Sequence, residues 1–86
     1  MSTVAAIKDR LATLQPTRLD VIDDSAQHAG HAGARDGGGH YRVLIVSERF
    51  AGLATMARHR LVYDALGPLM NGAIHALSIT ARAPAE

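Results

Sequence analysis

Apolar side chains recur along the chain with two periods, one typical of helices and one typical of strands. Helical spacing covers residues 1–14, where Pro16 follows, and residues 54–66, where Gly67 follows. The sequence therefore predicts two amphipathic helices. Their apolar stripes are formed by Val4, Ile7, Leu11 and Leu14 in the first and by Leu61, Val62, Ala65 and Leu66 in the second.

Three shorter segments, residues 18–24, 40–48 and 73–81, are rich in branched apolar residues and predict strands. In the second of them both odd and even positions are apolar, which indicates a central strand covered on both faces. Because a helix separates the second and third strands, the chain can cross over and place those two strands parallel. The order α-β-β-α-β predicts one α+β domain over residues 1–86, with a three-stranded mixed sheet and its helices packed on one face.

Composition excludes several classes of protein. The 86 residues include five histidines and no cysteine, which removes disulfides, thiolate nucleophiles and any iron–sulfur cluster held by this chain alone. The formal charge of +1 is too balanced for a protein that coats nucleic acid or anionic lipid. No stretch approaches the ~20 apolar residues of a membrane span, so we expect no membrane association and a cytoplasmic location.

The segment 25–39 differs from the rest of the chain and predicts a long loop. It contains five of the eight glycines, together with His28 and His31. Imidazole is a ligand for zinc, copper, nickel and iron, and loops of this length are often functional. Two interpretations follow, because the same histidines suit either solvated loop positions or a zinc or nickel buffer site.

Three further features have candidate chemistry. His75 lies at the start of the last strand, and simple alternation places it on the same face as Leu77 and Ile79. Arg58, His59 and Arg60 form a basic triplet near the start of the second helix, with Arg49 upstream; such a group suits phosphate or an acidic partner, or simply a solvated helix face. Arg58 also falls near the centre of that helix's apolar stripe. No arrangement resembles an enzyme site, so we expect no catalysis.

Four segments, taken in order, resemble the BolA family. They are LDVIDDS at residues 19–25, VSERFAG at residues 46–52, RHRLVY at residues 58–63 and IHALSI at residues 74–79, and the resemblance extends over essentially the whole chain. The most specific parts are the S-x-R-F-x-G stretch, the R-H-R-x-V-Y helix start and the I-H-A-L strand. The resemblance implies an α-β-β-α-β fold similar to class II KH domains, in agreement with the order of elements above.

The resemblance also implies a partner and a cofactor. BolA proteins pair with monothiol glutaredoxins of the C-G-F-S type and hold a bridging [2Fe-2S] cluster, for which glutaredoxin and glutathione supply sulfur and BolA supplies histidine nitrogen. By position, the strand ligand is His75 and the loop ligand is His28, so the chain resembles the histidine-loop type. Family loops commonly have proline after this histidine; here Ala29 follows, and His31 is a candidate substitute. The isolated chain is expected to hold no cofactor.

Some BolA proteins are also described as DNA-binding transcription regulators. In this chain the candidate contacts for that alternative are Arg49, Arg58, His59 and Arg60. The same residues are candidates for a protein-binding surface.

Overall fold

The computed structural model describes residues 2–25 and 39–86. Within them, two α-helices and three strands follow in the predicted α-β-β-α-β order, and their boundaries lie within two residues of the predicted ones except where short 3-10 turns extend or replace a helix end. Nearly all of the predicted loop lies outside the described residues. The elements are α1 (Thr3–Leu11), β1 (Arg18–Asp23), β2 (Gly39–Val46), α3 (Thr55–Leu66) and β3 (Ile74–Arg82), with 3-10 turns at Ala12–Leu14, Glu48–Phe50 and Gly67–Asn71.

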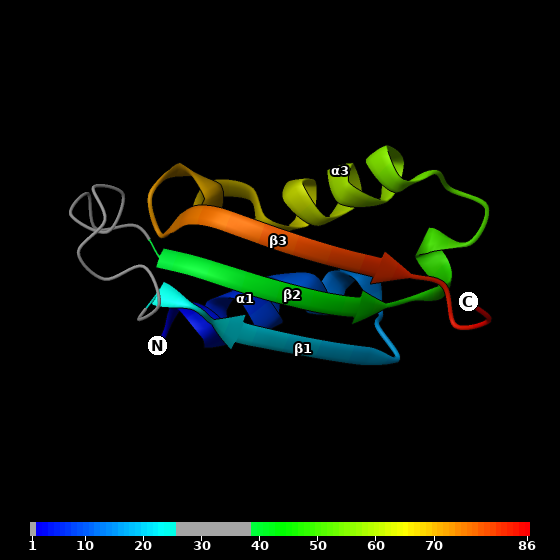
Figure 1. Ribbon diagram of the computed structural model, residues 1–86, viewed down its shortest axis with the longest axis horizontal. Coiled ribbons are helices and arrows are strands. Elements are labelled where there is room, and N and C mark those ends of the chain that lie inside the picture. The colour runs from blue at the N-terminus through cyan, green and yellow to red at the C-terminus, as the bar shows by residue number, and fades with distance from the viewer. Residues whose placement is uncertain (1, 26–38) are drawn as a thin grey trace.

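The three strands form one mixed sheet in the order β1-β2-β3 (Figure 1). β1 pairs antiparallel with β2, and β2 pairs parallel with β3. α3 follows β2 and precedes β3, so the helix supplies the crossover that a parallel pair requires. This topology confirms the mixed three-stranded sheet predicted from the sequence.

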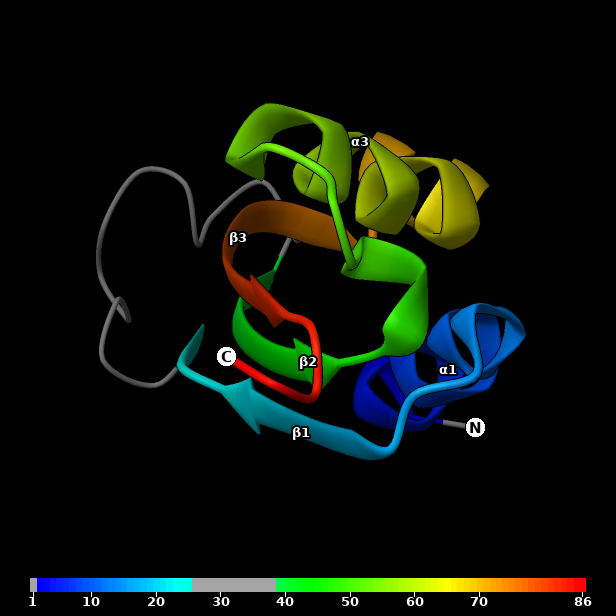
Figure 2. The same cartoon turned by 90° about the vertical axis from the view of Figure 1, so that its right-hand side faces the viewer.

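Both helices lie on one face of the sheet, and no helix of residues 2–25 and 39–86 covers the opposite face (Figure 2). α1 packs against β1 and α3, and α3 packs against β3. The odd positions of β2 point into this layer, whereas Leu44 on the other face is only half-buried. The strand is central, but the predicted coverage of both its faces is wrong. The buried hydrophobic core is made of Ile7, Leu11, Leu14, Tyr41, Val43, Ile45, Phe50, Val62, Leu66 and Ile74.

One buried hydroxyl joins the 3-10 turn after α1 to the end of the central strand. Ser47 is fully buried, and its Oγ donates a hydrogen bond of 2.6 Å to the carbonyl oxygen of Leu14. The same Oγ accepts a bond of 3.1 Å from the backbone N–H of Arg49. Because a buried hydroxyl is costly unless it is paired, these bonds fix how the chain leaves β2 and enters α3.

Candidate functional site

His75 occupies an irregularity at the start of β3. In the parallel ladder Gly39 is opposite Ile74, whereas His40 is opposite Ala76, so His75 is an extra residue on β3. Such a bulge interrupts the alternation of side chains between the two faces of a sheet. Ile74 is therefore the buried residue, at 3% exposure, and His75 is exposed.

This arrangement corrects the placement of His75 expected from alternation. Counting back from Leu77 and Ile79, which pack against the core, gives His75 the core face. The bulge moves the buried position to Ile74 instead. The imidazole is consequently available at the surface, as a metal ligand must be.

Among the described residues, His40 has a ring contact with His75. The centroids of the two imidazole rings are 5.3 Å apart, and the ring planes are inclined at 50°. The backbone of His40 is held from β1: its N–H donates to Ser25 Oγ at 3.0 Å, and its carbonyl oxygen accepts from the Asp24 N–H at 2.7 Å. His40 was not among the metal ligands predicted from the sequence. A usable signal was present, because parallel β2 and β3 must begin at the same end of the sheet.

The predicted loop ligands, His28 and His31, lie outside the described residues. The two described residues that flank the segment, Ser25 and Gly39, are at the end of the sheet where β2 begins. The Gly39 N–H donates to the Ala73 carbonyl oxygen at 3.1 Å, which joins this end of β2 to the approach of β3. The loop histidines are thus attached, along the chain, to the same end of the sheet as His75.

Arg58 points away from solvent, although the sequence suggested it as a surface contact. Its Nε donates to the carbonyl oxygen of Leu53 at 2.8 Å, and its Nη1 donates to the carbonyl oxygen of Ala81 at 3.1 Å. Nη1 and Nη2 also form a two-pronged ion pair with the Glu86 carboxylate. The Arg58 side chain is 13% exposed, and it occupies an interior position in the apolar stripe of α3. Its guanidinium donates hydrogen bonds to Leu53, Ala81 and Glu86 of the same chain.

The other three basic candidates do not converge on one site. His59 and Arg60 lie beside Met56 and Tyr63 in a shallow depression on the outer side of α3. Arg49 lies in the 3-10 turn after β2, where its Nη2 is 3.5 Å from Gln15 Oε1. The structure therefore separates Arg49 and Arg58 from the half-buried His59 and the exposed Arg60.

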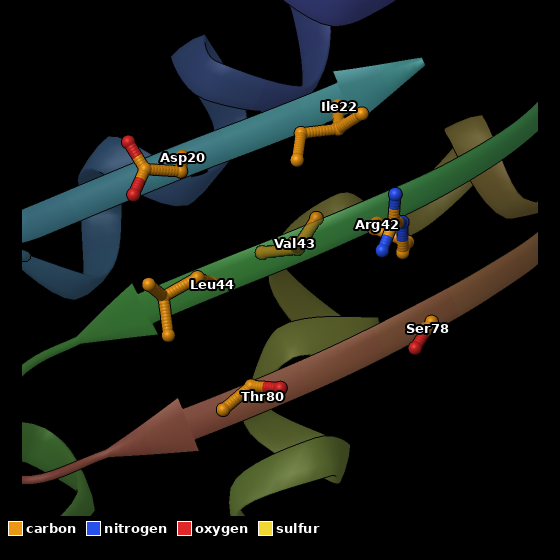
Figure 3. Close-up of a pocket in the computed structure, with 7 residues that line it drawn as sticks. All are labelled: Asp20, Ile22, Arg42, Val43, Leu44, Ser78 and Thr80. Atoms are coloured by element: carbon orange, nitrogen blue, oxygen red, sulfur yellow. The ribbon is translucent and has the colours of Figure 1, made fainter. Parts of the chain in front are cut away.

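The open face of the sheet has a second shallow pocket, crossed by all three strands (Figure 3). Arg42 is one of the residues that line it and pairs with Asp24, whose side chain is 12% exposed. The lining combines one cation and one carboxylate with hydroxyls and aliphatic groups, which is no recognisable catalytic set. Its lining is Asp20, Ile22, Arg42, Val43, Leu44, Ser78 and Thr80.

The described part of the chain has neither a preformed cluster of metal ligands nor a membrane-spanning helix. Residues 2–25 and 39–86 contain no cluster of three or more His, Cys, Asp or Glu side chains arranged to hold a metal ion. No helix in these ranges is long and apolar enough to cross a bilayer.

Comparison with known proteins identifies the family. The family model described as BolA-like protein matches residues 11–86. A Sinorhizobium protein named for its position in the cobS 5′ region is 44% identical over 89 residues, covering 100% of this chain and 96% of that protein. The Arabidopsis thaliana SufE-like protein 1, chloroplastic/mitochondrial, is 47% identical over 78 residues, covering 85% of this chain but only 21% of that protein.

A solved structure supports the same assignment. The structure of BolA1 from Arabidopsis thaliana superimposes with a TM-score of 0.84 at 34% identity, covering 100% of this chain and 96% of that one. The fold, with two helices on one face of a three-stranded mixed sheet, matches that of BolA structures. The chain belongs to the BolA family.

Proposed function

We propose that this BolA-like protein is a non-enzymatic adaptor that pairs with a monothiol glutaredoxin of the C-G-F-S type and co-ligates a bridging [2Fe-2S] cluster, in cluster trafficking or iron regulation. The observation that carries the proposal is the position of His75, an exposed imidazole on a β-bulge at the end of the sheet from which the glycine-rich loop departs. Family membership supports it, and so does the cysteine-free sequence, since every thiolate would have to come from the partner's side.

Of the two histidine ligands that the proposed [2Fe-2S] cluster needs from this chain, one lies among the described residues. His75 supplies one accessible nitrogen ligand, and His28, or His31 in its place, would supply the second from the loop. Replacing thiolate by neutral imidazole makes an iron–sulfur cluster less negative and raises its reduction potential. The role of these histidines is to offer an unprotonated nitrogen, because a protonated imidazole cannot bind metal.

The test is reconstitution of the complex. The full chain is mixed with a C-G-F-S glutaredoxin, glutathione, iron and sulfide, and the visible absorption and circular dichroism spectra are compared with those of the glutaredoxin homodimer. We expect a changed spectrum with the wild-type chain, and the homodimer spectrum with His75→Ala. Ser78→Ala, at an exposed position further along β3, is the control and should behave as wild type. If His75→Ala retains the changed spectrum, the ligand assignment is wrong.

The loop ligand needs separate variants. His28→Ala and His31→Ala are compared in the same reconstitution, singly and together. If His28 is the ligand, His28→Ala alone alters the spectrum and His31→Ala does not. The opposite result assigns His31. A double variant that remains like wild type removes the loop from the proposal.

DNA binding by the KH-like surface is the alternative function, and the structure makes it less favourable. Of its four candidate residues, Arg58 already donates to Glu86 and to two backbone carbonyls. Arg60 is exposed and His59 is half-buried, so together they offer only a small basic surface, in a chain with a formal charge of +1. DNA binding predicts an affinity that falls steeply with salt and is weakened by Arg60→Ala; absence of promoter binding near physiological salt would exclude it.

A cytoplasmic location remains part of this proposal. The Arabidopsis SufE-like relative is named as a chloroplastic/mitochondrial protein, so the location is a property to be tested separately from the fold. Imaging or fractionation of the natural protein, with the glutaredoxin followed in parallel, would show whether the two proteins share a compartment.

A further inference from the structure

The two imidazoles at the start of β2 and β3 form a pair that the proposed cluster function does not require. His40 and His75 come from neighbouring parallel strands, which begin at the same end of the sheet (Figure 1). We propose that His40 and His75 together bind one transition-metal dication in the free protein, each through one ring nitrogen, with water completing the coordination. We call this pair the two-histidine site.

The separation of the rings matches that of two imidazoles on one ion. A zinc–nitrogen bond is about 2.0–2.1 Å, which puts the ion roughly 3.2 Å from each ring centroid. At a tetrahedral angle, two such centroids are then about 5.2 Å apart. The observed separation is 5.3 Å.

The two ligands differ in how firmly they are held, and the difference favours binding. His40 is half-buried, and hydrogen bonds to Ser25 and Asp24 fix its backbone on both sides. His75 is exposed on a bulge, where its ring has room to adjust. One fixed ligand and one adjustable ligand lower the entropy lost on binding while still permitting correct geometry.

The ligand type selects the class of ion. Imidazole nitrogen suits Zn²⁺, Co²⁺, Ni²⁺ and Cu²⁺, whereas Mg²⁺ and Ca²⁺ prefer oxygen ligands. The carboxylate of Asp24, which lines the same shallow pocket as His40, is already paired with Arg42. The site is therefore a nitrogen site, and we expect no response to Mg²⁺.

The inference does not depend on glutaredoxin. It shares His75 with the proposed cluster function, but it is tested on the free chain without glutathione, iron or sulfide. Failure of the two-histidine site would leave cluster ligation by His75 open, and failure of cluster ligation would leave the site open. His40 distinguishes the two, because the cluster proposal assigns it no role.

The experiment uses the full chain without a polyhistidine tag. Zn²⁺ binding is measured by calorimetry, and Co²⁺ is used as a spectroscopic probe because its visible bands report the coordination geometry. We expect one ion per chain, and at least a tenfold loss of affinity in both His40→Ala and His75→Ala, since even removing an indirect support of a ligand costs that much. His59→Ala and the double variant His28→Ala/His31→Ala should retain the site.

A second measurement uses the wild-type chain, so a poorly folded variant cannot obscure the result. Small additions of Co²⁺ should broaden the ring-proton NMR signals of His40 and His75 before those of His59. Equal broadening of all histidines, binding that survives both His40→Ala and His75→Ala, or binding lost only in the loop double variant would each overturn the inference. The last outcome would instead support metal binding by His28 and His31.

Discussion

Arg58 and Glu86 form a two-pronged ion pair that joins the first turn of α3 to the turn after β3. The Ala83 N–H adds a third hydrogen bond to the same carboxylate, at 3.1 Å. The pair acts together with the bonds from Arg58 to the carbonyl oxygens of Leu53 and Ala81. One guanidinium on α3 therefore contacts the connector before that helix, the end of β3 and the side chain of Glu86. A two-pronged Arg–carboxylate pair is more directional than a single contact, which makes it suited to this positioning role.

This ion pair predicts an acid-dependent loss of stability. Hydrogen bonds from Arg58, and then from the Ala83 N–H, lower the pKa of Glu86 from its ordinary 4.5 to about 2. A carboxyl group with a lowered pKa in the folded state contributes stability that is fully present above the unfolded value and is lost as the pH falls through the folded value. The contribution of Glu86 should therefore be complete above pH 4.5 and decline toward pH 2.

The measurement is thermal unfolding of wild type and Glu86→Gln across that pH range. We expect wild type to be the more stable near neutral pH and the difference in Tm to shrink on acidification. The comparison is needed because the pKa of Asp23 is also lowered, by hydrogen bonds from Ser25, and this second carboxyl contributes to acid sensitivity in both proteins. A difference in Tm that stays constant down to the lowest pH would contradict the assignment.

Tyr41 is predicted to pack in its observed position only if residue 39 is glycine. A Cβ at position 39 would lie 2.5 Å from the Tyr41 ring, which is only 7% exposed and cannot move without disturbing the core. Gly39→Ala should therefore lower the free energy of unfolding by about 1–3 kcal/mol, the usual range for overpacking. Urea denaturation tests this. Gly72→Ala is the control, because a Cβ there meets nothing within 4 Å, and equal effects of both variants would argue against the packing explanation.

Ser47 is predicted to stabilise the junction between β2 and α3. Ser47→Ala removes the donor to the Leu14 carbonyl oxygen and the acceptor for the Arg49 N–H in a fully buried position. Leaving such groups unpaired should reduce the free energy of unfolding by about 1–3 kcal/mol. Chemical denaturation of Ser47→Ala and of Ser78→Ala, an exposed serine on β3, separates this effect from a general cost of removing a hydroxyl.

The residues that were placed correctly from sequence are those governed by local period. Tyr41, Val43 and Ile45 are buried because every second side chain of a strand faces the same layer. The placement of His75 required knowledge of a one-residue bulge, which depends on how β3 pairs with β2 and has no signature in β3 alone. The helical stripe indicated the inward position of Arg58, but local pattern could not identify its partner Glu86, which is 28 residues away.

The candidate site shows the same division. His75 was noted as a candidate from its position at the start of a strand, but its role as a metal ligand came from the resemblance to BolA proteins. The contact between His40 and His75 follows from the parallel pairing of two strands separated by a whole helix, so it appears only once the register is known. Local pattern therefore defines the elements, and long-range pairing decides which side chains meet.

The last prediction separates the proposed ligand role of His75 from any structural role. Because His75 is exposed on a bulge, His75→Ala should change the free energy of unfolding by no more than about 0.5 kcal/mol. Its neighbour Ile74 is 3% exposed, and Ile74→Ala should cost about 2–5 kcal/mol through lost burial and the cavity left behind. Urea denaturation of the two variants checks both values. A large loss of stability in His75→Ala would mean that its effect on cluster spectra reports unfolding rather than ligation.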